Sequence, residues 1–226
     1  ECEKLTEVIV KSIVPQNLTV AADAILSGVG SLTNSLVTMN GILVPGLLSI
    51  SPTGAIDFGG KNLMVNASGE IRVTARKCAT DVSSASTNGC STLMNINSMN
   101  CNGTISVGLS SSAEFVVGDS IRIWDAKVNQ GTPKLNPETV EAGNGLFWDA
   151  SRLKEGLLFV TDQAPEGYHK KGDVNEDGVV DINDVVAIIN QMAGTAEWRY
   201  ANVNEDADGN VDINDVVAVI NIMAGN

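Results

Sequence analysis

The stretch DVNEDGVVDINDVVAIINQMAG, residues 173–194, and the stretch NEDADGNVDINDVVAVINIMAG, residues 204–225, are two copies of one sequence. Asp181 in the first copy and Asp212 in the second occupy the same place, so the repeat period is 31 residues. Duplication at a fixed period indicates a structural unit that is built twice. Each copy joins an acidic, glycine-containing stretch to an apolar one, which predicts a loop followed by a helix.

The first loop carries oxygen-bearing side chains at the spacing of a calcium-binding loop. Counted from Asp173, they fall at positions 1, 3, 5, 9 and 12, with Gly178 at position 6, where the chain must bend sharply. A calcium ion takes about six to eight oxygen ligands, one of them a backbone carbonyl at position 7. The predicted ligands of the first ion are Asp173, Asn175, Asp177, Val179 through its carbonyl oxygen, Asp181 and Asp184.

The second loop repeats this pattern when the count starts at Asn204, because Gly209 then stands at position 6. The string NVNEDADG offers Asn202 as another start, but we prefer the count from Asn204 for the place that it gives the glycine. Asn at position 1 removes one negative charge, so weaker binding is expected here. The predicted ligands of the second ion are Asn204, Asp206, Asp208, Asn210 through its carbonyl oxygen, Asp212 and Asp215.

Apolar residues recur at helical spacing behind each loop, and this stripe is predicted to bury one face of a short helix. Gly194 and Gly225 are expected to end the two helices. No comparable helical pattern precedes Asp173, so each unit is a loop with its exiting helix only. The stripes are Ile182, Val185, Val186, Ile189 and Met192 in the first copy, and Ile213, Val216, Val217, Ile220 and Met223 in the second.

Duplicated loop–helix units with Asp at position 12, separated by residues 195–201, resemble a dockerin module. The resemblance implies a small α-helical domain with two EF-hand-type loops, which binds two calcium ions and docks onto a cohesin domain of another protein. In dockerins, positions 10 and 11 of each loop help to select the partner. These positions hold Ile182 and Asn183, then Ile213 and Asn214. Because the pairs are identical, the resemblance implies a pseudo-symmetric surface that binds in two orientations.

The charge of the chain is concentrated in this tail. Residues 172–226 hold eight Asp, three Glu and one Arg, a net charge of −10 out of −13 for the whole chain. Without a basic stripe, a nucleic-acid partner is not expected, and no apolar run is long enough to span a membrane. The chain does not begin with Met, which suggests a processed or truncated product. Cys2, Cys78, Cys90 and Cys101 match no metal motif and leave three disulfide connectivities open.

The region before the tail is predicted to be mainly β. From Asn17 to about Val73, short apolar segments alternate with Gly, Asn, Ser or Pro, which predicts strands of three to five residues. A β-solenoid, whose stacked rungs share one core, explains this pattern, and a β-sandwich is the alternative. The string LTVAADAILSGVGSLTNSLVTMNGILVPGLLSI and the later strings VGDSIRIWDA and GLFWDASRLKEGLLFV resemble the closing rungs of autotransporter-type secreted β-helix proteins, over residues 17–162. The resemblance implies a right-handed solenoid.

Three segments follow from these patterns: a β-rich domain over 1–162, a linker over 163–171, and the dockerin-like module over 172–226. The linker, QAPEGYHKK, has Pro, Gly and charge but no apolar period. Its His169 is the only histidine and is interpreted as solvated. The aromatic residues of the closing strings, Trp124, Phe147, Trp148 and Phe159, are interpreted as a cap over the end of the β domain rather than as a platform for sugar rings.

No recognisable catalytic motif occurs, and the carboxylates of the β domain are scattered. The sequence therefore predicts a non-catalytic structural or attachment protein, joined to a cohesin-like partner through its calcium-loaded tail. Weak calcium sites suit an extracellular or cell-surface location. Two alternatives remain open: the C-terminal part of a polysaccharide-degrading enzyme, and a self-assembling subunit of an extracellular fibre. Binding of a glycan is compatible with either class.

Overall fold

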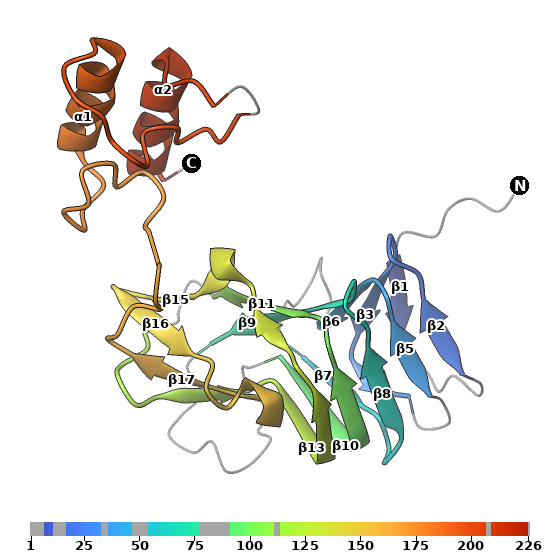
Figure 1. The fold of residues 1–226 in the computed structure, drawn as a ribbon. Helices are drawn as coiled ribbons and strands as arrows, with labels where there is room; N and C mark the ends of the chain where they lie inside the picture. The colour runs from blue at the N-terminus through green and yellow to red at the C-terminus, as the bar shows by residue number, and fades with distance from the viewer. Residues whose placement is uncertain are drawn as a thin grey trace, which may run out of the picture. The chain divides into compact units, whose positions relative to one another are not determined.

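The computed structural model describes residues 7–10, 17–32, 36–46, 54–76, 91–110, 114–206 and 209–225. The chain divides into two compact units, Glu1–Pro165 and Glu166–Asn226. This division falls inside the segment 163–171. The strands of the described residues lie in the first unit and the two α-helices in the second, as Figure 1 shows.

The first unit contains two large sheets in which neighbouring strands pair in parallel. The β-rich N-terminal domain is therefore confirmed, whereas the β-sandwich alternative is wrong, because sandwich sheets are antiparallel. One sheet contains β1 (Glu7–Val10), β3 (Ile25–Gly28), β6 (Ile42–Pro45), β9 (Glu70–Ala75), β11 (Thr104–Leu109) and β14 (Lys134–Leu135). The other contains β2 (Leu18–Val20), β4 (Gly30–Ser31), β5 (Val37–Met39), β7 (Ala55–Asp57), β8 (Asn62–Val65), β10 (Thr92–Cys101) and β13 (Trp124–Gly131).

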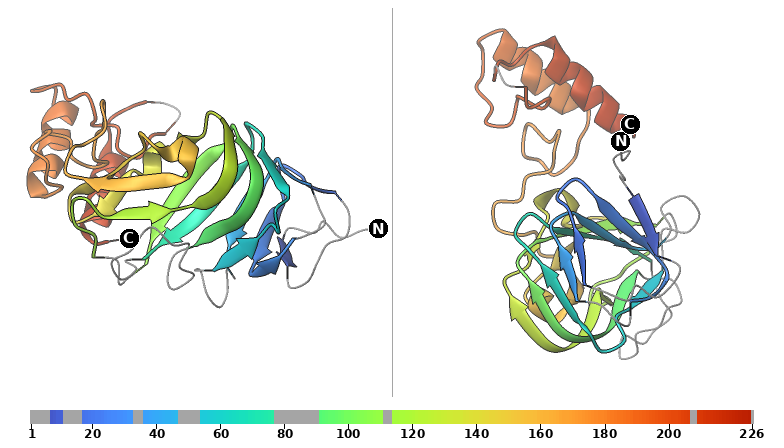
Figure 2. Two further views of the ribbon diagram at one scale, coloured as in Figure 1. Left: turned by 90° about the horizontal axis from the view of Figure 1, so that it is seen from below. Right: turned by 90° about the vertical axis from the view of Figure 1, so that its right-hand side faces the viewer.

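These strands form a coil with three faces, which is the course of a parallel β-solenoid (Figure 2). The chain passes through β2, β3 and β4, and then through β5, β6 and β7, each strand pairing with the one above it. Strand β10 covers two faces, because Thr92–Met94 pairs with β7 and Ser98–Cys101 pairs with β8. The coils differ in length: Leu18, Val37, Leu63, Met99 and Asn129 stack in register, although 19, 26, 36 and 30 residues separate them.

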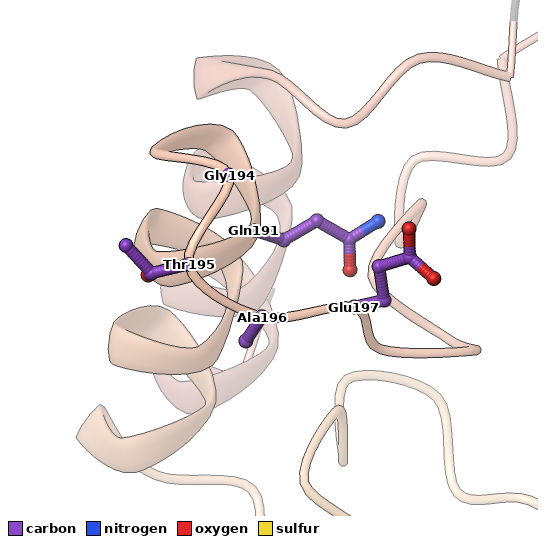
Figure 3. Close-up of a pocket in the computed structure, with 5 residues that line it drawn as sticks. All are labelled: Gln191, Gly194, Thr195, Ala196 and Glu197. Carbon is purple, nitrogen blue, oxygen red and sulfur yellow. The ribbon is translucent and has the colours of Figure 1, made fainter.

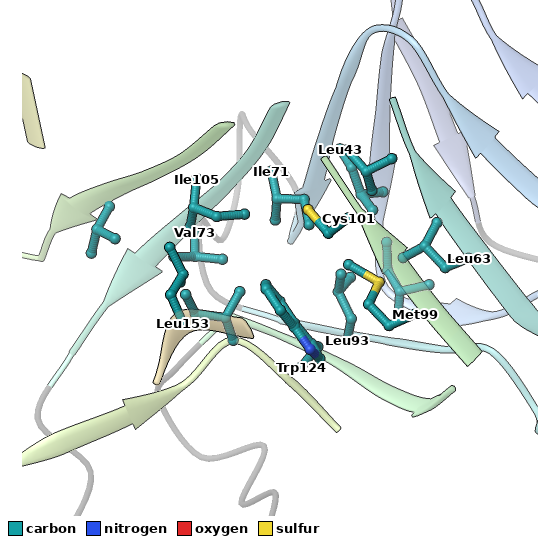
Figure 4. Close-up of a cluster of buried hydrophobic side chains, with 14 of the residues drawn as sticks. Leu43, Leu63, Ile71, Val73, Leu93, Met99, Cys101, Ile105, Trp124 and Leu153 are labelled. Atoms are coloured by element: carbon teal, nitrogen blue, oxygen red, sulfur yellow. The ribbon is translucent and has the colours of Figure 1, made fainter. Parts of the chain in front are cut away.

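The inside of the coil is a single hydrophobic core. In β9, Ile71, Val73 and Ala75 are buried and alternate with residues that point outward, as expected for a strand with one buried face. Figure 4 shows side chains of successive coils meeting around Trp124. The labelled residues of this cluster are Leu43, Leu63, Ile71, Val73, Leu93, Met99, Cys101, Ile105, Trp124 and Leu153.

Cys101 is a free thiol inside this core, and burial raises its pKa to about 11. Each of the three connectivities includes Cys101, so none of them is complete in this structure. Cys2, Cys78 and Cys90 lie outside the described residues.

One corner of the coil is built from asparagine and glycine. The Asn66 amide Nδ2 donates a hydrogen bond of 2.7 Å to Asn40 Oδ1 at the same corner one coil earlier. Gly131 lies at this corner with φ +86°, and a Cβ atom there would stand 2.2 Å from the carbonyl oxygen of Cys101. Only a glycine allows the coils to approach this closely, because a side chain would clash with backbone.

An antiparallel sheet closes the C-terminal end of the solenoid core. Its strands pair in the order β12 (Ser120–Arg122), β17 (Leu157–Thr161), β16 (Leu146–Asp149) and β15 (Glu141–Gly143). Trp148 is 2% exposed, and its ring meets Phe115 edge to face at 5.0 Å. Trp124 and Trp148 thus lie in the hydrophobic core and form no exposed sugar platform. Short 3-10 helices, η1 (Pro137–Thr139) and η2 (Leu153–Glu155), connect the strands.

The second unit packs two eleven-residue helices, α1 (Ile182–Met192) and α2 (Ile213–Met223), against each other. Both end just before a glycine with positive φ, as predicted for Gly194 and Gly225. Apart from Val185 and Val216, however, the predicted stripes are exposed. The buried residues are Asp184, Val185, Ala187 and Ile188 in α1, and Asp215, Val216 and Val219 in α2. The exposed ones are Ile182, Val186, Ile189 and Met192, and Ile213, Val217, Ile220 and Met223.

Candidate metal-binding loops

The first loop turns its oxygen atoms inward before α1. Asp173 is 5% exposed, and its carboxylate accepts hydrogen bonds from the backbone N–H groups of Asp177 (3.0 Å) and Gly178 (2.9 Å). The Asn175 amide oxygen accepts from Asp177 at 3.0 Å, and the Asp177 carboxylate accepts from Val179 at 2.9 Å. The chain therefore curls around three side-chain oxygens that fall at positions 1, 3 and 5 of the loop.

Asp184, at position 12, fastens the end of this loop to its beginning. Its fully buried carboxylate accepts from the N–H groups of Val174 (2.7 Å), Asn175 (3.2 Å) and Asp181 (2.8 Å). The bond from Asp181 belongs to a capping box, in which the Asp181 side chain caps the first turn of α1 in return. Asp184 thus has a structural role in the helix terminus besides its predicted role as a ligand.

The second loop makes the same bonds in part. The Asp215 carboxylate is fully buried and accepts from the N–H groups of Asn204 (3.1 Å) and Asp212 (2.8 Å), and Asp212 caps α2. The Asn204 side chain donates to Asp206 Oδ2 at 2.8 Å and accepts from the Asp206 N–H at 3.1 Å. These are the bonds that Asn175 makes to Asp177 in the first loop.

This correspondence corrects the register that we preferred from the sequence. Asn204 takes the place of Asn175, at position 3, and not that of Asp173. Glu205 has φ +52° where Glu176 has +59°, which supports the same alignment. By this alignment Asn202 occupies position 1. The signal was available in the sequence, because the string VNED precedes the glycine in both copies and Ala207–Asp208 lengthens only the second.

Two oxygen atoms of the second loop are buried without a hydrogen-bond partner, Asn202 Oδ1 and Asp206 Oδ1. A buried acceptor without a partner is costly to a fold unless it binds something. Hard cations such as calcium take oxygen ligands, so these two oxygen atoms fit calcium. Asp208, predicted as a ligand here, lies outside the described residues.

Within the described ranges no three His, Cys, Asp or Glu side chains converge on one point. The predicted ligands also include Asn side chains and the carbonyl oxygens of Val179 and Asn210, which are not among these four residue types. The carboxylates of the first loop also point at backbone N–H groups, which satisfy the same lone pairs that a cation would use.

The helices present a second candidate surface. The four exposed side chains of the α1 stripe are 45–60% exposed, and those of the α2 stripe are 46–60% exposed, position for position. Large apolar side chains at this spacing, gathered on helix faces, are the usual form of a surface that binds another protein. We call these two sets the matched stripes.

Contacts within the second unit also involve residues of the predicted linker. The His169 ring stacks on Tyr200 with centroids 3.5 Å apart, and the Lys171 ammonium lies 3.1 Å from the Glu205 carboxylate. His169, interpreted from the sequence as a solvated linker residue, is partly exposed and packs on the segment between the two repeats.

A pocket of about 400 Å³ opens where α1 ends (Figure 3). Its lining consists of Gln191, Gly194, Thr195, Ala196 and Glu197. The Gln191 amide oxygen already accepts the Trp198 N–H at 2.6 Å, so this side chain holds the interrepeat segment against the helix. Gln191, Thr195 and Glu197 are the polar residues of this lining.

Polar side chains of the solenoid form rows across neighbouring coils. Glu70 receives hydrogen bonds from Arg72 (2.8 Å) and Ser106 (2.6 Å), and Asn136 donates to Ser106 at 3.0 Å. Burial raises the pKa of Glu70, but the hydrogen bonds from Arg72 and Ser106 outweigh it and leave the pKa below its usual value. Glu70 is thus an ionised member of a satisfied network, which is a structural role.

Comparison with known proteins gives no relative: no family model, no curated protein and no solved structure matches this chain. In the described part of the chain, no helix is long and apolar enough to cross a membrane.

Proposed function

We propose that this protein is a non-catalytic attachment protein of the cell surface or extracellular space. Its second unit acts as a dockerin-like module that binds two calcium ions and docks onto a cohesin-like partner, while the β-solenoid is the attached part. The observation that carries the proposal is the duplication of one loop–helix unit. Two acidic loops with the same capping aspartates precede two helices with the same exposed apolar residues.

In the first loop, Asp173, Asn175, Asp177, Asp181 and Asp184 hold the ion together with the Val179 carbonyl. Calcium supplies two positive charges, which offset the repulsion among the four carboxylates that this short loop contains. The internal hydrogen bonds keep this loop curled and its oxygens facing inward, so less ordering is needed when the ion binds. Asp184 also caps α1, so ion binding and helix stability are linked through one carboxylate.

Titration of the chelated full-length protein with calcium tests this half of the proposal. We expect two binding events by calorimetry, and a rise in helical circular dichroism as the ions bind. Magnesium at equal concentration should produce a much smaller change, because it prefers rigid octahedral sites that keep several waters. Absence of heat and of any spectral change on adding calcium would refute calcium binding.

Partner docking is supported by the matched stripes. Eight large apolar side chains that are about half exposed are unusual on a unit of this size, because such patches normally mark interaction sites. The acidic surroundings, with a net charge of −10 over residues 172–226, favour a partner whose apolar docking patch has a basic rim. Since the stripes match position for position, either helix is able to make the central contact.

The stripes predict an unusual result for paired substitutions. We expect Ile189→Asp and Ile220→Asp singly to weaken partner binding only a few-fold, because the other helix takes over. The double variant should weaken it by about a hundredfold, or about 3 kcal/mol. The partner is first captured from secreted proteins of the source organism, as a cohesin-like domain that binds in calcium but not in chelator. Its affinity is then measured for the wild type and for each variant.

Val128→Asp is the matched control, because Val128 is also about half exposed but lies on β13 of the solenoid. Circular dichroism should show that all these variants keep their helices. Full loss of binding in one single variant would rule out interchangeable helices, and unchanged binding in the double variant would rule out the stripes as the docking surface.

A further inference from the structure

We infer that the pocket at the end of α1 binds a guanidinium group, and that an arginine side chain of the docking partner supplies it. The pocket adjoins the end of the α1 stripe, since Gln191, which lines the pocket, precedes Met192 in the helix. The inference rests on the proposed docking and goes beyond it, because it adds a polar contact and gives this contact to one helix only.

Two side chains with acceptor oxygens line this pocket. Gln191 and Glu197 come from the two ends of the lining segment, and Figure 3 shows their side chains extending to the same side of the chain. The Gln191 amide oxygen accepts the Trp198 N–H at 2.6 Å, which fixes its position and leaves it a second lone pair. Glu197 is exposed, and its carboxylate has no hydrogen bond or ion pair with the residues that the structure describes.

The end of α1 is also negative. The carbonyl groups at the C-terminus of a helix carry about half a negative charge, and the last turn of α1 contains no basic residue. Arg199 is the only base between the two helices, and its guanidinium lies over the Tyr200 ring, 5.2 Å from the ring centre. A cation from another protein therefore complements the charge at this pocket.

A guanidinium group suits these acceptors better than an ammonium group does. It presents five N–H donors in a planar fork and has no acceptor of its own. The Glu197 carboxylate is able to accept two of these donors side by side, and the Gln191 amide oxygen a third. The volume of about 400 Å³ admits the group together with its alkyl chain.

The end of α2 is built differently. Ile222 takes the place of Gln191 in the second repeat, and it is partly buried against the hydrophobic cluster of the unit. A Cβ atom at Gly172 would stand 3.1 Å from Ile222 Cδ1, so the chain that enters the first loop packs on this side chain. The polar lining of the pocket is therefore not repeated, and the two orientations of docking differ in this one contact.

Heteronuclear NMR of the full chain tests the inference, with N-acetyl-arginine amide as the probe. We expect chemical-shift changes in the Gln191 side-chain amide and in the N–H groups of Gly194 and Thr195, which saturate at about millimolar concentration. N-acetyl-citrulline amide has the same shape without the charge, and should bind at least about tenfold more weakly. Glu197→Gln should weaken binding of the arginine probe about tenfold. Glu166→Gln removes the same charge from an exposed site in the same unit, and should change it by less than about twofold.

Equal binding of the arginine and citrulline probes would overturn the inference, and so would shift changes centred outside the pocket. The captured partner tests the docking contact: Glu197→Gln should lower its affinity about tenfold, and an unchanged affinity would show that the partner places no arginine there. Circular dichroism should show that both variants keep their helices. Failure to capture any partner would instead count against the proposed docking, and the probe titration, which needs neither partner nor calcium, then decides the pocket by itself.

Discussion

Asp184→Ala is expected to lower the calcium affinity of the first loop by about a hundredfold and to destabilise the second unit by about 3 kcal/mol even without calcium. The reason is the double role of this carboxylate. Its removal leaves three backbone N–H groups, those of Val174, Asn175 and Asp181, without their acceptor. Each buried donor left unsatisfied costs about 1–3 kcal/mol before water enters, and loss of a helix cap costs about 1 kcal/mol.

Urea unfolding followed by circular dichroism measures the effect, first with chelator and then with calcium. Asp184→Asn is the matched variant: it keeps an oxygen acceptor of the same size but loses the charge, so calcium binding should fall further than stability. Asn183→Ala, one residue earlier and exposed, should change stability by less than about 0.5 kcal/mol. Equal stability of Asp184→Ala and the wild type in chelator would show that the hydrogen bonds of Asp184 do not hold the loop.

The two helices of the tail could be predicted from the sequence because one loop–helix pattern occurs twice at a period of 31 residues. The sequence did not determine which face of each helix is buried. Apolar residues occur at 182, 185, 186, 188 and 189, so more than one stripe fits a helical period. In the structure Val185, Ala187 and Ile188 are buried and Ile182 is exposed. Periodicity alone cannot rank two apolar faces.

The second register failed for a different reason. Placing Gly209 at position 6 gave a regular twelve-residue count, whereas in the structure Asn204 makes the bonds that Asn175 makes at position 3 of the first loop. Hydrogen bonds to Asp215 fix where a residue lies in the loop, and such bonds are not visible in a residue count.

The solenoid was predictable as a class but not in its pairings. Stacked residues such as Leu18, Val37, Leu63 and Met99 are separated by between 19 and 36 residues, so no period exists to find. Parallel pairing joins strands that are distant in sequence, and loops of unequal length between them cost little once the core forms. The core residues could be predicted from the alternation of apolar and polar residues along each strand, as the buried Ile71 and Val73 show.

Trp124 is one of the largest fully buried side chains of this core. Its side chain is fully buried, and its indole Nε1 donates a hydrogen bond of 2.8 Å to Asn129 Oδ1. Trp124 pairs with Leu93 of the coil below, and Leu153 lies in the same cluster (Figure 4). A Cβ atom at Gly156 would stand 2.7 Å from the Trp124 ring, so the backbone above it is closely packed. The tryptophan therefore fills the space between the last coil and the closing segment.

Trp124→Ala should lower the free energy of unfolding of the solenoid by about 4 kcal/mol, because the closely packed walls cannot collapse into the space. Trp124→Phe keeps most of the volume and loses the hydrogen bond to Asn129, so it should cost about half as much. Val128→Ala, in the same strand but about half exposed, should cost less than about 0.5 kcal/mol. Urea unfolding gives these values, and an unchanged calcium titration would show that the second unit, with its own hydrophobic cluster, stays folded. A loss for Trp124→Ala no larger than that for Val128→Ala would mean that the cap and the coils do not share a core.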